Sequence, residues 1–279
     1  MAENLHRLKY IASNNQEIDL DNIDITFQTG LGLKIDKWNS DIKNGLVNKI
    51  NREAHEIDVD VIFTDIEKAK EALHLFNNDN YQELYGYFYC DDWYQAGNVV
   101  ECKLDNQYKT YIKASLKIIL RWGYWLKPKT LRIEGSEETK DGLDFPFDFE
   151  FDFQLNSATN AYVDVEGSTG AYVGFVFYGA VDNPAVIISG NKYQVNASCE
   201  ARERIIVDPY GRDIIGGSIY KVNAFGGETN LFDSRLKGAR DSGSYIFQKL
   251  PPGHHKVNYS AGMIFDVIFY EESGTPPWI

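Results

Sequence analysis

The sequence predicts a mainly β protein with one helix, and three observations support that prediction. The chain has 18 Tyr and 16 Phe against 2 Met, and planar rings suit the half-buried surface of a sheet. Apolar and polar residues alternate with a period of two in many short segments. Turn signals such as Asn183-Pro184, Gly190-Asn191 and Asp208-Pro209 recur between those segments, with the spacing typical of β-sandwiches.

Length and charge set further limits. The 279 residues suffice for one large domain or two medium ones, and 43% hydrophobic residues can build a sizeable core. Asp and Glu number 41 against 28 Lys and Arg, which gives a formal net charge of −13. A protein that grips nucleic acid by its phosphates needs clustered Lys and Arg, so this balance argues against that class.

The first half of the chain predicts strands around one helix. Apolar residues between Ile18 and Phe27 indicate strands, and His55–Phe63 alternates regularly between polar and apolar residues. Thr64-Asp65 is a typical helix cap, and the spacing that follows predicts a helix over 66–76. The polar run Asn77–Asn80 is predicted to end that helix as a turn.

Two more strands follow in this half. Tyr85, Tyr87 and Tyr89 alternate with other residues and so share one face of a predicted strand. Gly97-Asn98 is predicted to be a turn, and alternation resumes over 111–119.

The polar stretch Glu134–Gly142 is the best candidate for a domain boundary. We therefore expect an N-terminal domain over 1–143 and a C-terminal domain over 144–279. The second begins with five phenylalanines at alternate positions between Phe145 and Phe153, with acidic residues from Asp144 to Asp152 between them. This pattern predicts a buried aromatic stripe beside a solvated acidic edge.

The remainder is predicted to be a β-sandwich of short strands. They are expected at 161–166, 172–178, 185–188, 193–197, 204–207, 218–222, 245–247, 255–260 and 265–270.

Motifs for nucleophilic or nucleotide chemistry are missing or incomplete. Gly216-Gly217-Ser218 lacks the closing glycine of a nucleophile elbow. Gly30-Leu31-Gly32 begins like a dinucleotide-binding loop, but Ile35 stands where the third glycine belongs. A plain loop is the favoured interpretation.

Acidic and histidine clusters have equally plain explanations. Cys90-Asp91-Asp92-Trp93 could place an acid pair beside an aromatic platform, as in a glycosidase cleft, but a hairpin tip with a partly buried Trp is favoured. The run Asp144–Asp152 could collect calcium, but its strand spacing favours a solvated face. His254-His255 would point to opposite faces of a strand, which makes them poor joint ligands.

The three cysteines, Cys90, Cys102 and Cys199, cannot all pair within one chain, and none lies in a CxxC motif. We expect buried, reduced thiols in a soluble protein that folds in the cytoplasm, because the chain start lacks the apolar core of a signal peptide. The sequence predicts no catalytic, cofactor-binding or metal site, hence neither an enzyme nor a cofactor.

The last third contains an ordered series of motifs. Asn183, Pro184 and Ile187 come first, followed by Arg204–Asp208. The ending SYIFQKLPPGHHKVNYSAGMIFDVIFYEESGTPPWI then supplies Phe247, Leu250, Pro251, Gly253, Val257 and Pro277-Trp278. This order resembles the C-terminal region of siphophage distal tail proteins and related tail-component proteins, and the likeness extends more weakly over the first half.

The resemblance implies a β-rich, ring-forming N-terminal domain followed by a galectin-like β-sandwich. Members of that family form a hexameric ring that joins the tail tube protein to the tail-associated hub protein and to receptor-binding or baseplate proteins. The implied partners are other copies of the chain and those proteins, while DNA only passes through the channel and no membrane is inserted. The implied location is the virion tail tip after assembly in the host bacterial cytoplasm.

Two other classes remain open. A carbohydrate-binding module could use Trp93, Trp122 and Trp125 to stack on sugars. An acid-dependent glycoside hydrolase would need two carboxylates facing one cleft. Within the resembled family, the sequence does not separate a distal tail protein from a baseplate or contractile-tail component.

Overall fold

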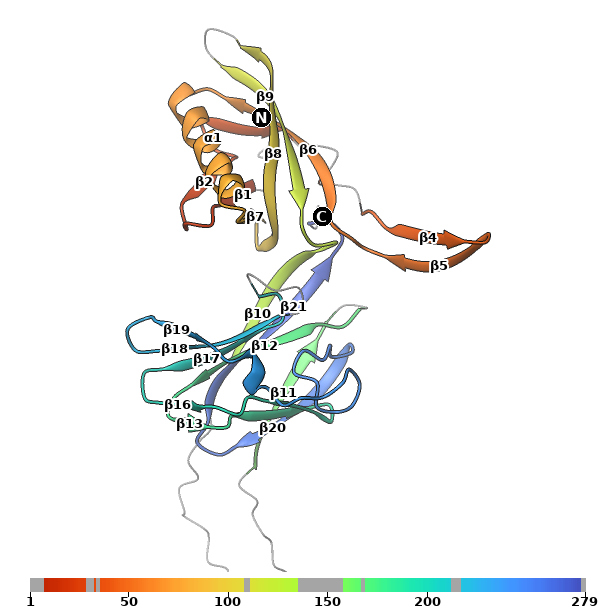
Figure 1. The fold of residues 1–279 in the computed structure, drawn as a ribbon, viewed down its shortest axis with the longest axis vertical. Helices are drawn as coiled ribbons and strands as arrows, with labels where there is room; N and C mark the ends of the chain where they lie inside the picture. The colour runs from red at the N-terminus through yellow and green to blue at the C-terminus, as the bar shows by residue number, and fades with distance from the viewer. Residues whose placement is uncertain are drawn as a thin grey trace, which may run out of the picture. The chain divides into compact units, whose positions relative to one another are not determined.

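The computed structural model describes residues 8–28, 33, 36–107, 111–134, 158–166, 169–211 and 217–276. The protein is mainly β, as predicted, and divides into two compact units (Figure 1). Unit 1 comprises Met1–Lys127 and Glu272–Ile279, and unit 2 comprises Pro128–Glu271. The predicted domain boundary after Leu143, and the phenylalanine stripe beyond it, lie outside the described residues.

Unit 1 contains one α-helix among its described residues, together with a set of antiparallel strands. These are β1 (Leu8–Ile11), β2 (Glu17–Asp19), β3 (Ile25–Gln28), β4 (Asn39–Lys43), β5 (Leu46–Asn51), β6 (His55–Phe63), α1 (Ile66–Tyr81), β7 (Gly86–Cys90), β8 (Trp93–Gln107), β9 (Ile112–Leu120) and the start of β10 (Trp125–Glu134).

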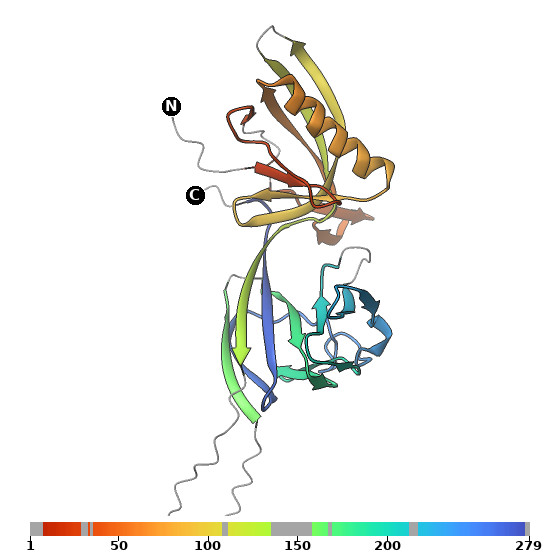
Figure 2. The same cartoon turned by 90° about the vertical axis from the view of Figure 1, so that its left-hand side faces the viewer.

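The main sheet of unit 1 runs in the order β2-β1-β7-β8-β9-β6-β3, with every neighbouring pair antiparallel. The predicted strand His55–Phe63 is confirmed as β6, and its apolar residues alternate into the core. Figure 2 shows α1 lying over these strands. The helix buries Ala69, Ala72, Leu75 and Phe76 against them.

The start of the helix is confirmed, but its predicted end is wrong. The Asp65 side chain caps α1 by accepting a 2.8 Å hydrogen bond from the Glu67 amide. The helix then continues through the polar run to Tyr81, because Asp79 is fully buried and accepts hydrogen bonds from the Tyr10 and Ser13 hydroxyls. These partners lie far back in the sequence, and they stabilise helical turns that local propensity would end.

The predicted turn at Gly97-Asn98 is also wrong. Strand β8 passes straight through it, and a Cβ atom at position 97 would come within 2.6 Å of the Ile119 carbonyl oxygen. The glycine thus permits close approach of two strands rather than a reversal. The chain reverses at Asp91-Asp92 instead, where Asp91 takes a φ of 52°.

Unit 2 is built from the rest of β10 and a second set of strands. These are β11 (Ala158–Val165), β12 (Tyr172–Tyr178), β13 (Val181–Asp182), β14 (Ala185–Ile188), β15 (Asn191–Gln194), β16 (Ser198–Cys199), β17 (Arg204–Asp208), β18 (Ser218–Val222), β19 (Glu228–Asn230), β20 (Gly253–Ser260) and β21 (Ile264–Ser273), with a 3-10 turn at Phe232–Ser234.

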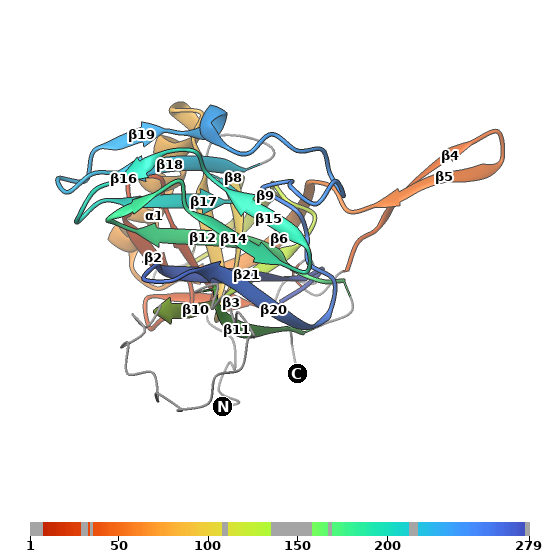
Figure 3. The same ribbon diagram turned by 90° about the horizontal axis from the view of Figure 1, so that it is seen from below.

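Two sheets form the sandwich of unit 2. One runs in the order β10-β21-β12-β17-β18-β19, and the other in the order β11-β20-β14-β15 (Figure 3). Their inner faces share one core, in which Phe175, Phe177, Val186, Tyr193 and Phe265 are fully buried. The predicted β-sandwich is therefore present, and its strands lie close to the expected positions.

The strand predicted at 245–247 is wrong. Tyr245 lies in a loop whose backbone pairs with the Asn191 side chain, because the amide nitrogen donates to the Tyr245 carbonyl at 2.9 Å. Ile246 and Phe247 are buried from this loop, which explains their strand-like composition.

Candidate assembly surfaces

The acid pair in Cys90-Asp91-Asp92-Trp93 forms the tip of the β7–β8 hairpin, as the favoured interpretation predicts. Asp92 pairs with Lys127 at 3.2 Å, and its side chain is 78% exposed. Trp93 is half-buried against the core of unit 1. An exposed, salt-bridged carboxylate at a hairpin tip lacks the enclosed cleft that glycoside hydrolysis requires.

The two adjacent histidines point to opposite faces, as predicted. His254 is exposed, lies 2.7 Å from the Asp164 carboxylate and stacks on Tyr162. His255 is buried, with Nδ1 2.5 Å from the Ser189 hydroxyl and Nε2 2.8 Å from the Pro251 carbonyl oxygen. Because the carbonyl can only accept, Nε2 carries the proton and Ser189 donates to Nδ1. This pair fastens a turn to β20.

All three cysteines are free thiols. Burial and the neighbouring Asp91 raise the pKa of Cys90 to about 12, and burial also raises the pKa of Cys102 and Cys199. Thiols with raised pKa values are poor nucleophiles. Within the described residues, no group of His, Cys, Asp or Glu has the arrangement of a metal site.

Other predicted motifs fall partly outside the described residues. Gly30-Leu31-Gly32, Ile35 and the acidic run Asp144–Asp152 all lie there, as does Pro277-Trp278. Gly217 is described and has a φ of 93°, and Ser218 begins β18 rather than a helix. No helix in the described part of the chain is long and apolar enough to span a membrane.

The three tryptophans considered for sugar stacking do not form an open platform. Trp125 is 2% exposed in the core, and Trp122 packs against the rings of Tyr87 and Tyr94. The exposed stacked pair in unit 2 is instead Tyr162 and His254, whose ring centroids lie 4.9 Å apart.

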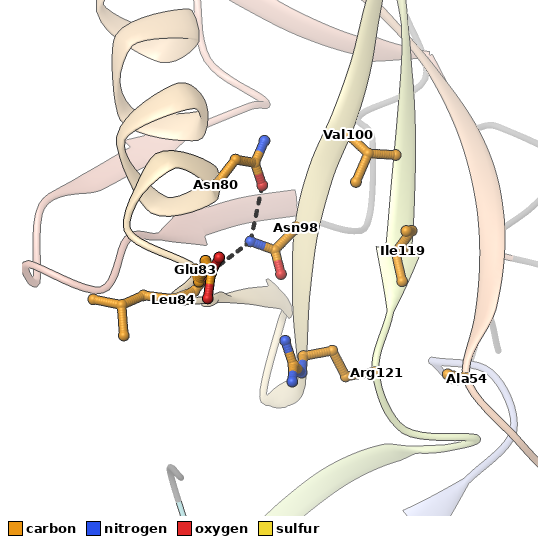
Figure 4. A pocket seen from close by; sticks show the side chains of 8 residues that line it. All are labelled: Ala54, Asn80, Glu83, Leu84, Asn98, Val100, Ile119 and Arg121. Atoms are coloured by element: carbon orange, nitrogen blue, oxygen red, sulfur yellow. Dashed lines mark hydrogen bonds between the residues drawn. The ribbon is translucent and has the colours of Figure 1, made fainter.

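A groove of about 480 Å³ lies in unit 1 where α1 ends beside β8 (Figure 4). We call this the groove, and its lining residues are Ala54, Asn80, Glu83, Leu84, Asn98, Val100, Ile119 and Arg121. Leu84 and Val100 are 41% and 45% exposed, which is unusual for apolar side chains on ordered strands and turns.

Asparagine side chains fix the wall of the groove. Asn98 donates to the Asn80 side chain at 3.0 Å and to the Leu84 carbonyl at 2.8 Å (Figure 4). Asn80 in turn donates to the Val99 carbonyl at 2.7 Å. Arg121 stacks on Tyr85 at 4.4 Å from its ring centroid. The groove is therefore a pre-formed surface with an apolar floor and the Glu83 carboxylate at its edge.

A second surface of unit 1 is the hairpin of β4 and β5, residues 39–51, which we call the arm. Figure 1 shows the arm projecting away from the other strands of unit 1. The turn Asn44-Gly45 has φ values of 53° and 77°, as a tight hairpin turn requires. Sequence reasoning missed the arm, although Asn-Gly between alternating residues was the available signal.

Unit 2 has its own polar groove, of about 390 Å³, beside the β18–β19 turn. Arg202 and Arg204 line it together with Glu203, which pairs with Lys221 at 3.2 Å. At the tip of the turn, Phe225 is 97% exposed. The Asn223 side chain accepts from the amides of Phe225 and Gly227 and so organises this tip.

Comparisons with known proteins find no protein-family model and no curated protein that match the chain. Solved structures do match over nearly its whole length. A chain of the phage P2 baseplate in its activated conformation with Ca is 11% identical, with a TM-score of 0.57, and the match covers 98% of this chain and 100% of that chain. The same baseplate with Sr gives 12% identity, a TM-score of 0.56 and the same coverage.

The third match is SPP1 Dit (gp 19.1), described as a paradigm of the hub adsorption apparatus in phages that infect Gram-positive bacteria. It is 11% identical with a TM-score of 0.52, and the match covers 96% of this chain and 99% of that chain. The protein therefore shares its fold, across both units, with phage baseplate and hub proteins, in agreement with the resemblance found in the sequence.

Proposed function

We propose that the protein is a structural component of a phage or prophage tail tip and performs no catalysis. The observation that carries this proposal is the full-length match in fold to the phage P2 baseplate chain and to SPP1 Dit, which includes both units. A match confined to one sandwich would support far less, because β-sandwiches host many unrelated functions.

In this proposal, unit 1 builds a hexameric ring around a channel, and unit 2 is a galectin-like domain that presents partner-binding surfaces. The ring joins the tail tube protein to the tail-associated hub protein and to receptor-binding or baseplate proteins. The net charge of −13 suits a wall past which DNA moves, because it repels phosphates rather than holding them. The location would be the virion tail tip, after assembly in the bacterial cytoplasm.

Two features of the surface support an assembly role. The arm and the groove expose apolar side chains on ordered backbone, and exposed apolar patches mark interaction sites. The titratable clusters identified from the sequence have structural explanations in the described residues, such as the Ser189–His255 contact that fastens a turn.

The test is the absolute mass by light scattering on a sizing column, with negative-stain images of the peak. We expect six times the chain mass and a six-fold ring. A single-chain mass at every concentration, with no ring when purified tail tube protein is added, would contradict the proposed function.

A carbohydrate-binding function is the second candidate, and one observation favours it. Tyr162 is 57% exposed and is held flat by stacking on His254 at an interplanar angle of 10°, which is the kind of platform on which sugar faces stack. Saturable binding on a glycan array that disappears in Tyr162→Ala would support it, whereas no binding by the wild type would exclude it for the glycans tested.

A further inference from the structure

The arm is amphipathic, with one apolar face. Residues directly opposite each other in a hairpin share a face, and the register pairs Ile42 with Val47 and Ser40 with Ile50. Ile42, Val47 and Ile50 therefore line one face, and they are 63%, 59% and 60% exposed. The other face carries the pairs Asp41–Lys49 and Asn39–Asn51.

This apolar face is uncovered on a ribbon whose base is fixed. In the described part of the chain, β4 and β5 pair with each other in a separate two-stranded sheet. At the base, Arg52 pairs with Asp36 at 2.7 Å and lies 4.2 Å from the ring centroid of Trp38. An isolated two-stranded hairpin is marginally stable in water, so its apolar stripe requires a cover from outside the chain.

The groove offers a matching surface in charge and polarity. The arm contributes Lys43 and Lys49 against Asp41, a net charge of 2 − 1 = +1, in a chain whose total is −13. The groove has exposed Leu84 and Val100 on its floor and Glu83 at its edge. A basic arm with an apolar face thus fits an acidic surface with an apolar floor.

We infer that the arm of one copy packs its apolar face into the groove of the neighbouring copy and so clasps adjacent subunits. This inference rests on the proposed ring, because each copy carries one arm and one groove, and such head-to-tail contacts close into rings. The six residues of β5 span roughly 20 Å at about 3.3 Å per residue, which is long enough to cross a subunit boundary. The rest of the molecule is acidic, and so a second copy provides the complementary charge.

The experiment uses full-length variants and light scattering. The arm variant is Ile42→Ser/Val47→Ser/Ile50→Ser, and its matched control on the polar face is Asn39→Ser/Asn51→Ser. The groove variant is Leu84→Lys/Val100→Lys, which places like charge opposite Lys43 and Lys49. All changes lie at exposed or half-exposed side chains, and circular dichroism verifies that each variant is folded.

We expect the arm and groove variants each to fall from the ring to the single-chain mass, while the control keeps the ring. A mixture of the two variants should give dimers and no rings, because one intact arm can still meet one intact groove. A symmetric, arm-independent interface would not produce this complementation.

The outcomes separate the clasp from the proposed function. A ring of unchanged mass in the arm variant overturns the clasp and leaves the tail-tip proposal in place. Arm-dependent dimers without any ring support the clasp and contradict the hexamer. As a second measurement, arm amides that exchange hydrogen equally fast at low and high wild-type concentration overturn the clasp, whatever mass is observed.

Discussion

The molecule contains two hairpins with the same local design and opposite environments. In unit 1, the arm turns at Asn44-Gly45, and in unit 2 the β14–β15 hairpin turns at Ser189-Gly190, with positive φ at all four residues. The apolar face of the unit 2 hairpin, with Val186, Ile188 and Tyr193, is fully buried. The corresponding face of the arm is about 60% exposed.

The difference comes from what each hairpin meets. Strand β14 also pairs with β20, and the sandwich core covers its inner face. The arm meets no third strand among the described residues. Identical local chemistry therefore stabilises unit 2 from within, whereas in unit 1 it leaves an apolar face available for assembly.

The largest expected contrast is between equivalent isoleucines. Ile188→Ala should lower the free energy of unfolding by about 2–5 kcal/mol, because it opens a cavity in a closed core. Ile42→Ala should change it by less than about 0.5 kcal/mol, because the side chain is already in water. Urea unfolding of dissociated protein measures both, and equal losses would contradict the comparison.

The second contrast is between the turn glycines. Gly190 and Gly45 have φ values of 78° and 77°, and a Cβ atom at either would meet nothing within 4 Å. Alanine thus adds backbone strain alone, roughly 1–2 kcal/mol. Gly190→Ala should destabilise unit 2 by that amount in urea, whereas Gly45→Ala should speed amide exchange in the arm and leave the unfolding midpoint unchanged. A shifted midpoint in Gly45→Ala would mean that the arm supports unit 1.

The third contrast concerns the anchor of the turn. Ser189→Ala removes the 2.5 Å contact with His255 Nδ1 and should cost about 1 kcal/mol, because it leaves a buried acceptor unsatisfied. Ser40→Ala on the arm, at an exposed position, should be neutral within about 0.5 kcal/mol. Thermal unfolding of the two variants beside the wild type checks this, and a neutral Ser189→Ala would show that the contact is dispensable.

The smallest expected effect is an alkaline one, specific to the buried hairpin. Burial raises the pKa of Tyr193, whose hydroxyl donates to the Gln248 carbonyl at 3.0 Å. A group whose folded pKa is raised contributes stability below its ordinary value of about 10 and loses it as pH rises further. Between pH 8 and pH 10.5 the loss should be below about 1 kcal/mol.

Tyr193→Phe should remove this part of the pH dependence, whereas Tyr162→Phe, at an exposed ring, should leave it in place. Urea unfolding at the two pH values measures the difference. An unchanged slope in Tyr193→Phe would assign the alkaline loss to other groups, such as Tyr10, whose pKa is likewise raised by burial and by Asp79.

Local patterns predicted much of the fold. Strands β6, β12, β14 and β18 begin and end where alternation places them, and Asp65 caps α1 as its side-chain chemistry requires. Alternation and capping act between residues a few positions apart, so one sequence suffices to predict them.

The errors arise where a distant residue decides a local structure. The helix extends past its predicted end because Asp79 meets Tyr10, 69 positions earlier. Gly97 lies within a strand because Ile119 approaches it closely. The loop around Tyr245 replaces a strand because Asn191 takes its backbone hydrogen bonds.

The assembly surfaces divide in the same way. The Asn44-Gly45 turn and the flanking alternation were sufficient to predict a hairpin, and the arm was missed by oversight rather than for lack of signal. The groove is different, because its lining comes from positions 54 to 121 on separate elements and exists only once the helix end lies beside β8.

The sequence by itself determined the strands, the helix start, the turns and the acidic charge, because these follow from neighbouring residues. Tertiary structure alone decided which apolar faces are covered, because coverage depends on strand partners far away in the chain. That is why Ile188 is part of a core while Ile42 is exposed on an arm, although both follow the same alternation.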